Sequence, residues 1–212
     1  MKFVRTKDGS FTAFSKKYKE HYHSLSGAIE EAFEKHVNAL GIEDGMQILD
    51  ICFGLGYNSI IATKKHKKLQ IVGLENDIEI IKAIKNLTVP KGIESEFTTF
   101  RDLAEKLEIT DTNNNTIKLI MGDALLSLNQ LPKEYFDRVF FDPFSPKKQP
   151  EMWSKEIFRK VYNVMKQGAK LSTYSCAKSI RQNMTDAGFK VMDGPAVGRK
   201  SPSTIGLKTH NP

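Results

Sequence analysis

The sequence predicts an α/β fold with a mostly parallel, seven-stranded sheet and helices on both of its faces. Seven apolar runs have the length and composition of buried strands: 46–52, 70–75, 117–121, 137–142, 169–174, 189–193 and 204–208. Helical patterns fall between several of them, at 57–68, 77–87, 123–131 and 153–167. An alternation of strands and helices favours a parallel sheet that helices cover on both faces.

The first 40 residues stand before this alternation. Residues 1–24 are polar and aromatic without a clean period, whereas the apolar residues of 24–40 have the spacing of one helix face. Gly41 ends this predicted helix, as glycine commonly does. The asparagine-rich stretch 111–116 indicates a loop, and no other segment reads as a linker. We therefore expect one domain over 1–212, with an N-terminal segment and helix (1–40) and an α/β core (41–212).

Composition excludes several classes of protein. No apolar run approaches the roughly 18 residues that span a bilayer, and the N-terminus lacks the apolar core of a signal peptide, so we expect a cytoplasmic protein without a membrane partner. Cys52 and Cys176 have no CxxC or histidine spacing and are predicted to be buried thiols. His21 and His23 are two residues apart but have no evident third ligand, so we expect no metal.

The net charge is unevenly distributed. Residues 145–212 hold 13 Lys and Arg against 4 Asp and Glu, a net of +9, whereas the whole chain carries +7. A basic third on a near-neutral body favours a polyanionic partner such as RNA. The alternative interpretation is a generally lysine-rich composition.

Glycines and acidic residues follow the first three predicted strands. Strand 46–52 leads into LDICFGLGYNS, and glycines at this point let a ligand approach the backbone of Gly54 and Gly56. Glu75 ends the second strand, where a carboxylate typically accepts hydrogen bonds from ribose hydroxyls. Asp123 ends the third strand, within MGDA. The alternative is that Glu75 and Asp123 only cap the helices that follow them.

The same positions discriminate between cofactors. A dinucleotide site requires glycine where this chain has Ser59, and a P-loop requires a GK[ST] that the chain lacks. An adenosine that carries a sulfonium amino acid fits better. The pattern resembles the class I S-adenosylmethionine-dependent methyltransferases, which have a Rossmann-like fold. This resemblance implies that Gly54 and Gly56 pass the methionine portion, that Glu75 holds the ribose and that Asp123 faces the adenine. Neighbouring residues are expected to complete the cofactor site: Asp50, Asn58, Asn76 and Ala124.

The stretch FFDPFSPKKQPEMW, 140–153, follows the fourth strand. Its prolines exclude both helix and sheet pairing, so it is an ordered turn at a strand end or a flexible linker. The strand-end alternative places Asp142 at the central cleft, beside the first strand. There it would contact the cofactor or the incoming nucleophile, unless it serves only to start the turn.

Several longer strings resemble the methyltransferase portion of the MnmC family of tRNA 5-methylaminomethyl-2-thiouridine biosynthesis proteins. They are DGSFTAFSKKYKEHYHSLSGAIEEA, ILDICFGLGYNS, FFDPFSPKKQPEMWS, TYSCAKSIRQNMTDAGFKV and GRKSP. The resemblance implies methyl transfer from S-adenosylmethionine to the amine of 5-aminomethyl-(2-thio)uridine at the tRNA wobble position. It also implies that the segment with Tyr22, His23 and Ser24 covers the cofactor. For such a reaction, the predicted place of Asp142 at the cleft makes it the candidate to accept the amine's proton or to orient the amine.

The resemblance extends to RNA contacts. Phe144 and Trp153 are candidates to stack on the wobble base, with a core role as the alternative for Trp153. Candidate phosphate contacts are Lys147, Lys148, Arg199 and Lys200, with a solvated lysine face as the alternative for the first pair. Because no flavin oxidase sequence follows, we expect a stand-alone methylase whose aminomethyl acceptor comes from a separate enzyme. The alternatives are an aminopropyltransferase related to spermidine synthase and a non-catalytic RNA-binding module.

Overall fold

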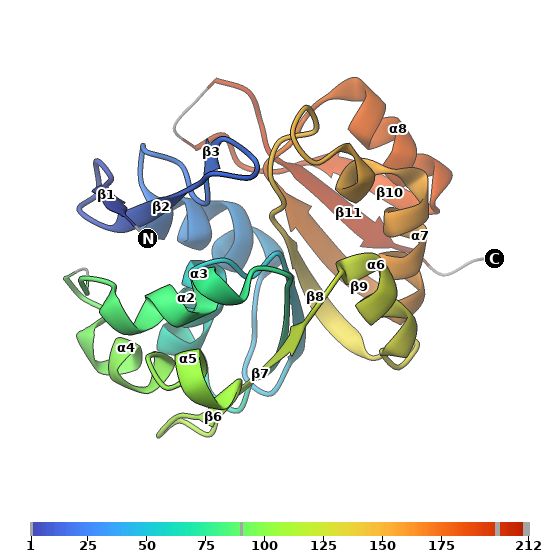
Figure 1. The fold of residues 1–212 in the computed structure, drawn as a ribbon. Coiled ribbons are helices and arrows are strands. Elements are labelled where there is room, and N and C mark those ends of the chain that lie inside the picture. The colour runs from blue at the N-terminus through green and yellow to red at the C-terminus, as the bar shows by residue number, and fades with distance from the viewer. Residues whose placement is uncertain (1, 90, 198–199, 210–212) are drawn as a thin grey trace.

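A central sheet of eight strands organises the structure, a computed structural model that describes residues 2–89, 91–197 and 200–209 (Figure 1). Its strands stand in the order β10-β11-β9-β8-β4-β5-β7-β6. Their bounds are β4 Gln47–Ile51, β5 Gln70–Glu75, β6 Glu108–Thr110, β7 Thr116–Met121, β8 Phe136–Phe141, β9 Met165–Thr173, β10 Phe189–Asp193 and β11 Thr204–Lys208. Strands β9, β8, β4, β5 and β7 pair in parallel, and the pairs at both edges are antiparallel. The predicted, mostly parallel α/β sheet is confirmed.

The prediction of seven strands omitted one. The eighth, β6, is three residues long and pairs with β7 at the sheet edge. Only Ile109 of this strand is buried. A single buried residue produces no alternating pattern, which is why the sequence did not indicate a strand there.

Helices cover both faces of the sheet, as predicted. Their bounds are α1 Ala28–Glu31, α2 Tyr57–Lys65, α3 Ile78–Ala83, α4 Glu94–Phe100, α5 Leu103–Lys106, α6 Ala124–Ser127, α7 Lys155–Val164 and α8 Lys178–Asp186. Figure 1 shows α2 to α5 on one side of the sheet and α6 to α8 on the other. An apolar core lies on each face of the sheet, and successive side chains of β4 point to opposite faces. Ile48 belongs to the core on the α2 side, and Leu49 belongs to the core on the α7 side.

The N-terminal segment differs from its prediction in two ways. It forms a small antiparallel sheet of β1 (Phe3–Arg5), β2 (Phe11–Ser15) and β3 (Glu20–His21). The predicted regular helix is a short α-helix, α1, that continues as a π-helix over Ala32–Asn38. Gly41 ends it with a left-handed φ of 59°, as expected. Because π-helical turns are frequent at functional sites, this segment points to the site described below.

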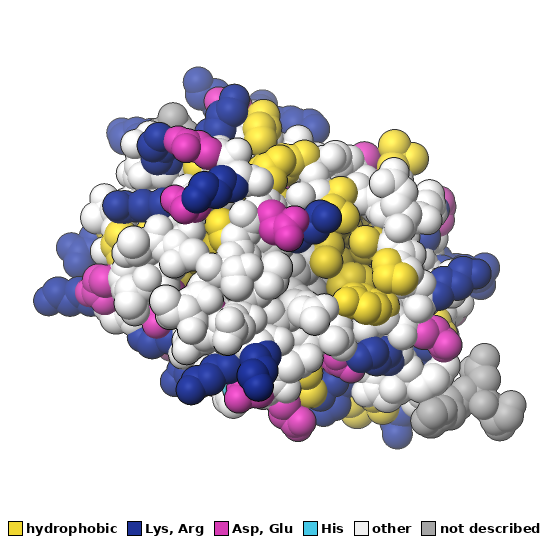
Figure 2. Space-filling model, turned by 90° about the horizontal axis from the view of Figure 1, so that it is seen from below, with side chains coloured by type: hydrophobic (Ala, Val, Ile, Leu, Met, Phe, Trp, Pro, Cys, Tyr) yellow, Lys and Arg dark blue, Asp and Glu magenta, His cyan; other side chains and the backbone are white. Residues whose placement is uncertain are grey.

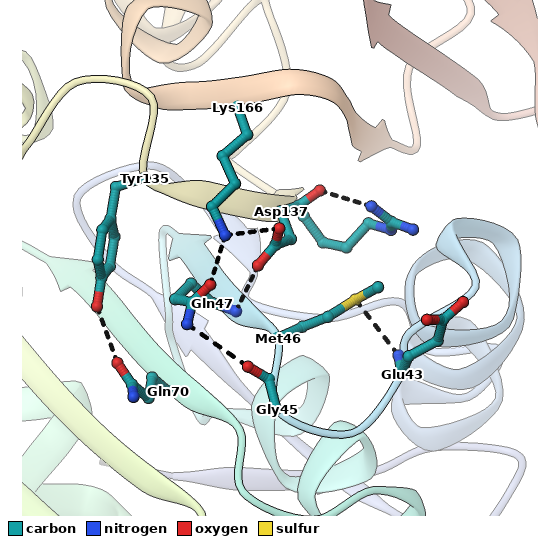
Figure 3. A network of polar contacts seen from close by, with 9 residues as sticks. Glu43, Gly45, Met46, Gln47, Gln70, Tyr135, Asp137 and Lys166 are labelled. Carbon is teal, nitrogen blue, oxygen red and sulfur yellow. Dashed lines mark hydrogen bonds and ion pairs between the residues drawn. The ribbon is translucent and has the colours of Figure 1, made fainter.

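Polar side chains fix the strand starts, at the end of the sheet away from that site (Figure 3). Lys166 Nζ donates to Asp137 Oδ1 at 2.8 Å and to Gln47 Oε1 at 2.6 Å. The Gln47 backbone N–H donates to Asp137 Oδ2 at 2.9 Å, which joins β4 to β8.

Seen from below, basic and acidic side chains lie interspersed around a hydrophobic patch (Figure 2). No helix in the described part of the chain is long and apolar enough to cross a bilayer.

Gly56 is the position where we expect a side chain to cost the most stability. It begins α2 with φ +78°, and an added Cβ would lie 2.7 Å from the Phe53 ring and 2.9 Å from the Phe100 ring. At Gly41, φ is +59° but no heavy atom lies within 4 Å. We expect Gly41→Ala to lower the free energy of unfolding by about 1 kcal/mol and Gly56→Ala by about 2–4 kcal/mol, measured by urea denaturation. Equal losses in the two variants would contradict the packing argument.

Candidate active site

A cavity of about 460 Å³ lies at the carboxyl ends of the parallel strands. The ends of β4, β5 and β8 form its floor, and the N-terminal segment forms much of its wall. Among the residues predicted from the sequence, those that line it are Tyr22, Ser24, Glu75, Asn76, Asp142 and Phe144. Parallel strands bring their carboxyl ends to one edge of the sheet, which is why these distant residues meet.

A smaller cavity of about 90 Å³ adjoins the first. Asp123 and Ala124 line it, as the resemblance implied for the adenine end. Both cavities are lined by Tyr18, Cys52, Glu75, Asn76 and Gln149. The end of β5 therefore lies at their junction, the place where a ribose would join an adenine in one cavity to a methionine in the other.

Glu75 is held by backbone donors. The N–H groups of Asn76 and Asp77 donate to its Oε1 at 2.8 and 2.9 Å, and that of Gly54 donates to Oε2 at 2.8 Å. Burial raises the pKa of this carboxyl, and the backbone hydrogen bonds oppose the rise. The capping alternative does not apply to Glu75, because Asp77 caps α3 by accepting from the Glu79 N–H.

Asp123 fits both of its predicted roles, as a helix cap and as a residue of the cofactor site. Its Oδ1 accepts from the Leu125 N–H at 2.8 Å and caps α6, while the residue also lines the smaller cavity.

The two cysteines are half-buried rather than buried as predicted, and Cys52 lines both cavities.

The two glycines of the first turn face protein rather than open space. The missing Cβ of Gly54 would lie 3.4 Å from the Tyr22 ring and 3.6 Å from His23, so the cover segment packs directly on this turn. Gly56 faces the Phe53 and Phe100 rings, and its N–H donates to the Phe53 carbonyl at 2.9 Å. At Gly56 the missing side chain thus permits core packing.

Asp50 and Asn58 lie beneath the cavity and do not line it. Asp50 is fully buried, and its Oδ2 accepts from the Ser59 hydroxyl at 2.6 Å. Burial raises the pKa of Asp50 to about 7. Asn58 is 3% exposed and donates through Nδ2 to Asp142 Oδ2 at 3.5 Å. Neither side chain therefore reaches a ligand in the cavity directly, and each would affect a ligand only through neighbouring residues.

Asp142 ends β8 and faces the larger cavity with its side chain 13% exposed. Burial is the main cause that raises the pKa of Asp142 to about 6, and the Asn58 hydrogen bond opposes it. A carboxylate with a pKa near neutrality is suited to take up and release protons at physiological pH.

The loop after Asp142 is ordered, which decides between the two interpretations of its prolines. Ser145 donates through N and Oγ to the two carboxylate oxygens of Glu20, at 2.9 and 2.5 Å. Phe144 stacks on Tyr18 with ring centroids 4.5 Å apart, so one of its faces is already covered. Trp153 is 2% exposed and donates to the Phe144 carbonyl, so it belongs to the core.

The candidate phosphate contacts that the structure describes do not line the cavity. Lys147 and Lys148 are exposed on the loop that follows Asp142, and Lys200 is exposed as well. Arg199 lies outside the described residues. Val197 lines the larger cavity, so this part of the chain reaches the cavity at that residue.

The end of α1 and the π-helix contribute groups that sequence reasoning missed. Glu31 and Lys35 form an ion pair that lines the cavity, and Lys35 is only 5% exposed. His36 is fully buried, with its Nε2 3.8 Å from Asp142 Oδ2. These side chains had the spacing of a polar helix face, and no local pattern distinguishes a solvated face from one that faces a cavity.

Comparison with known proteins agrees with this geometry. Residues 91–209 match a family described as S-adenosyl-L-methionine-dependent methyltransferases. The chain belongs to this family.

Relatives and solved structures extend the comparison. An uncharacterized protein of Methanocaldococcus jannaschii is 30% identical over 98% of this chain. The tRNA 5-methylaminomethyl-2-thiouridine biosynthesis bifunctional protein MnmC of Leptospira interrogans is 28% identical over 93% of this chain. The chain spans 60% and 34% of the lengths of these two relatives. The crystal structure of MnmC2 from Aquifex aeolicus has a TM-score of 0.80 and 28% identity, and covers all of this chain and 72% of its own. The spermidine synthase of Thermotoga maritima, at 11% identity and a TM-score of 0.62 over 98% of this chain and 72% of its own, shares the fold alone.

The methyltransferase uses S-adenosylmethionine, and the two cavities fit this cofactor. Glu75 lies at their junction with its carboxylate ordered by three N–H groups, as a ribose acceptor requires. The buried Nε2 of His23 has no hydrogen-bond partner among the described residues and lies near Gly54. Within residues 2–89, 91–197 and 200–209, no three His, Cys, Asp or Glu side chains form a group that could hold a metal ion.

The raised pKa of Asp142 predicts a pH dependence of stability. The folded protein keeps this proton up to about pH 6, whereas an ordinary aspartate releases it near 3.8. Between these values the folded state binds more protons than the unfolded state, so Asp142 lowers stability as pH rises. We expect Asp142→Asn to gain up to about 3 kcal/mol over the wild type between pH 4 and pH 7. Urea denaturation of both proteins at several pH values measures this, and a difference independent of pH would refute it.

Proposed function

We propose that this methyltransferase N-methylates 5-aminomethyl-(2-thio)uridine at the wobble position of tRNA, to give 5-methylaminomethyl-(2-thio)uridine. The observation that carries the proposal is the position of Asp142, a carboxylate poised to ionise near neutral pH, in the same cavity as Glu75, the candidate ribose acceptor. Its support from relatives is the similarity to MnmC over 93% of this chain and to MnmC2 over all of it.

Asp142 would perform the acid–base work of the reaction. S-adenosylmethionine supplies an activated methyl group, so the chain has to bring an uncharged amine into line with it. The acceptor amine arrives as an ammonium ion, and the ionised carboxylate of Asp142 attracts and orients it. Transfer of one proton to Asp142 frees the nitrogen lone pair for attack. Attack would form the N–C bond and break the bond from sulfur to the methyl carbon, so that the products are a secondary ammonium ion and S-adenosylhomocysteine. Both would leave through the cavity mouth, and Asp142 would return its proton to solvent.

Phe144 and the nearby lysines would position the RNA. Phe144 lines the cavity and keeps Tyr18 as its stacking partner on one face. The other face of the Phe144 ring would pack against the wobble base, as aromatic side chains do in RNA readers. Lys147 and Lys148 on the same loop, together with Lys200, would hold the flanking phosphates, and we propose the same role for Arg199, which lies outside the described residues.

Methyl transfer cannot create the amine that it consumes. A separate active site must therefore supply the aminomethyl group, and we propose that it belongs to another enzyme. The protein would act in the cytoplasm, where its tRNA substrate is found. The family match favours methyl transfer over the aminopropyl alternative, for which the spermidine synthase similarity provides the fold alone.

Mass spectrometry of tRNA nucleosides tests the reaction and the acceptor together. Three tRNA substrates, with an aminomethyl, a carboxymethylaminomethyl or no group on the wobble uridine, are incubated with S-adenosylmethionine. We expect a gain of one methyl group on the first alone. Asp142→Asn should bind S-adenosylmethionine normally but turn over about 10²–10⁴-fold more slowly. Methylation of unmodified tRNA, or none of any substrate, would overturn the proposal.

The lysines of the strand-end loop have their own test. We expect Lys147→Gln/Lys148→Gln to weaken tRNA binding about tenfold and to flatten its salt dependence by roughly 0.7–0.9 in logarithmic slope for each phosphate that the loop no longer neutralises. Filter binding between 50 and 200 mM salt measures both. The control is Lys106→Gln/Lys118→Gln, which removes two exposed lysines near β6 at the far edge of the sheet. Equal effects of the two pairs would mean that the loop makes no particular phosphate contact.

A further inference from the structure

His36 occupies a position that neither packing nor the proposed chemistry yet explains. It is a fully buried histidine on the π-helix, and its ring contacts the Phe140 ring edge-on. Its Nδ1 lies 2.8 Å from the hydroxyl of Ser172, which is also fully buried. Its Nε2 has no hydrogen-bond partner among the described residues, and the acceptor it faces is Asp142 Oδ2 at 3.8 Å. A buried polar atom without a partner is costly, so this geometry calls for an explanation.

We propose that His36 is a positioning residue for Asp142: its Nε2–H, fixed by Ser172, donates to Asp142 Oδ2 in the liganded site and leaves Oδ1 for the acceptor amine. This inference rests on the proposed function for the identity of the amine. It adds the residue that determines which oxygen of Asp142 accepts the amine's proton. Catalytic hydrogen bonds are often long without ligands and shorten when these bind, so 3.8 Å is a reasonable starting distance.

The two donors converge on one oxygen. Asn58 reaches Oδ2 from α2 at 3.5 Å, and His36 reaches the same atom from the π-helix at 3.8 Å. Donors on both sides of Oδ2 restrict rotation of the carboxylate, and the second oxygen then has a defined direction. Asp142 lines the cavity and its Oδ2 faces these two donors, so Oδ1 is the oxygen left for an incoming ammonium ion.

The proton on His36 follows from electrostatics. A nitrogen lone pair that faced a carboxylate oxygen would be repelled, so the hydrogen belongs on Nε2. Nδ1 is then an acceptor, and the Ser172 hydroxyl donates to it. Burial lowers the pKa of His36 to about 4, so the ring stays neutral near pH 7 and does not take the amine's proton. A neutral donor orients Asp142 and still leaves it basic enough to accept that proton.

Other titratable groups also act on Asp142. They come from every element around it: Lys35 on the π-helix, Asp50 of β4, Cys52 in the turn after β4, and Tyr174 after β9. Substitution of His36 leaves all four in place. A change in the pKa of Asp142 after such a substitution therefore reports on the loss of the His36 donor.

The test measures Asp142 directly. Carboxyl-¹³C-labelled aspartate in the intact protein gives its titration by NMR, with Asp142→Asn to assign the signal. A hydrogen-bond donor favours the ionised form, so its loss raises the carboxyl pKa. We expect the titration midpoint of Asp142 to rise by about one pH unit in His36→Met and to return toward the wild type in His36→Gln, whose amide restores a donor.

Three control measurements separate positioning from folding. His66→Met removes a histidine from a surface pair with Asp44 and should leave the Asp142 titration unchanged. S-adenosylmethionine affinity, measured by calorimetry, should be the same in His36→Met and the wild type. If His36→Met does not fold, Ser172→Ala carries the test, because without its hydroxyl the ring populates both tautomers and the midpoint of Asp142 rises by a smaller amount.

Turnover provides the second readout. In His36→Met the acid limb of the pH profile of kcat should move up by the same pH unit, and kcat at pH 6 should fall about fivefold. An Asp142 midpoint that is identical in His36→Met and the wild type overturns the inference, as does a wild-type ¹⁵N spectrum that shows His36 protonated on Nδ1. The ¹³C titration and the ¹⁵N spectrum need no tRNA substrate. A wild-type protein that fails to methylate tRNA therefore overturns the proposed function alone.

Discussion

The three backbone hydrogen bonds to the Glu75 carboxylate are the interaction on which the site depends. They join the turn after β4 to the start of the turn after β5, because one donor is Gly54 and the others are Asn76 and Asp77. The carboxylate is 6% exposed, and without these donors its burial would favour the protonated form. The hydrogen bonds therefore hold an acceptor at the junction of the two cavities.

Burial of acidic groups makes the site reactive and reduces the stability of the fold. Asp50 and Asp142 lie at the ends of neighbouring strands, and burial raises the pKa of each toward neutrality. Each group binds its proton more tightly in the folded protein than in the unfolded chain, so ionisation opposes folding. The apolar clusters on the two faces of the sheet offset this cost. Such a balance is common where a carboxylate must exchange protons near pH 7.

The N-terminal segment is part of the site because polar contacts attach it to distant loops. Glu20 accepts from Ser145, and the Tyr22 hydroxyl donates to Asp77 Oδ2 at 2.6 Å. The first contact joins β3 to the loop after β8, and the second joins the end of β3 to the start of α3. With both contacts made, aromatic side chains of the segment lie over the ends of β4 and β8. Beneath them Glu75 and the Asp142 side chain are only 6% and 13% exposed, and charge interactions are stronger where exposure to water is low.

The sequence by itself determined seven of the eight strands of the central sheet, the covered faces and the residues at the strand ends. Apolar runs of five to seven residues and the glycines that follow them are local signals, and Glu75, Asp123 and Asp142 were found from their place at the ends of those runs. Only the tertiary structure decided that Trp153 belongs to the core, that β6 forms and that the helix before Gly41 continues in π-helical form. It also decided that His36, 106 positions before Asp142, approaches that carboxylate. A local pattern reports the spacing of side chains along one element, whereas these features depend on packing between elements.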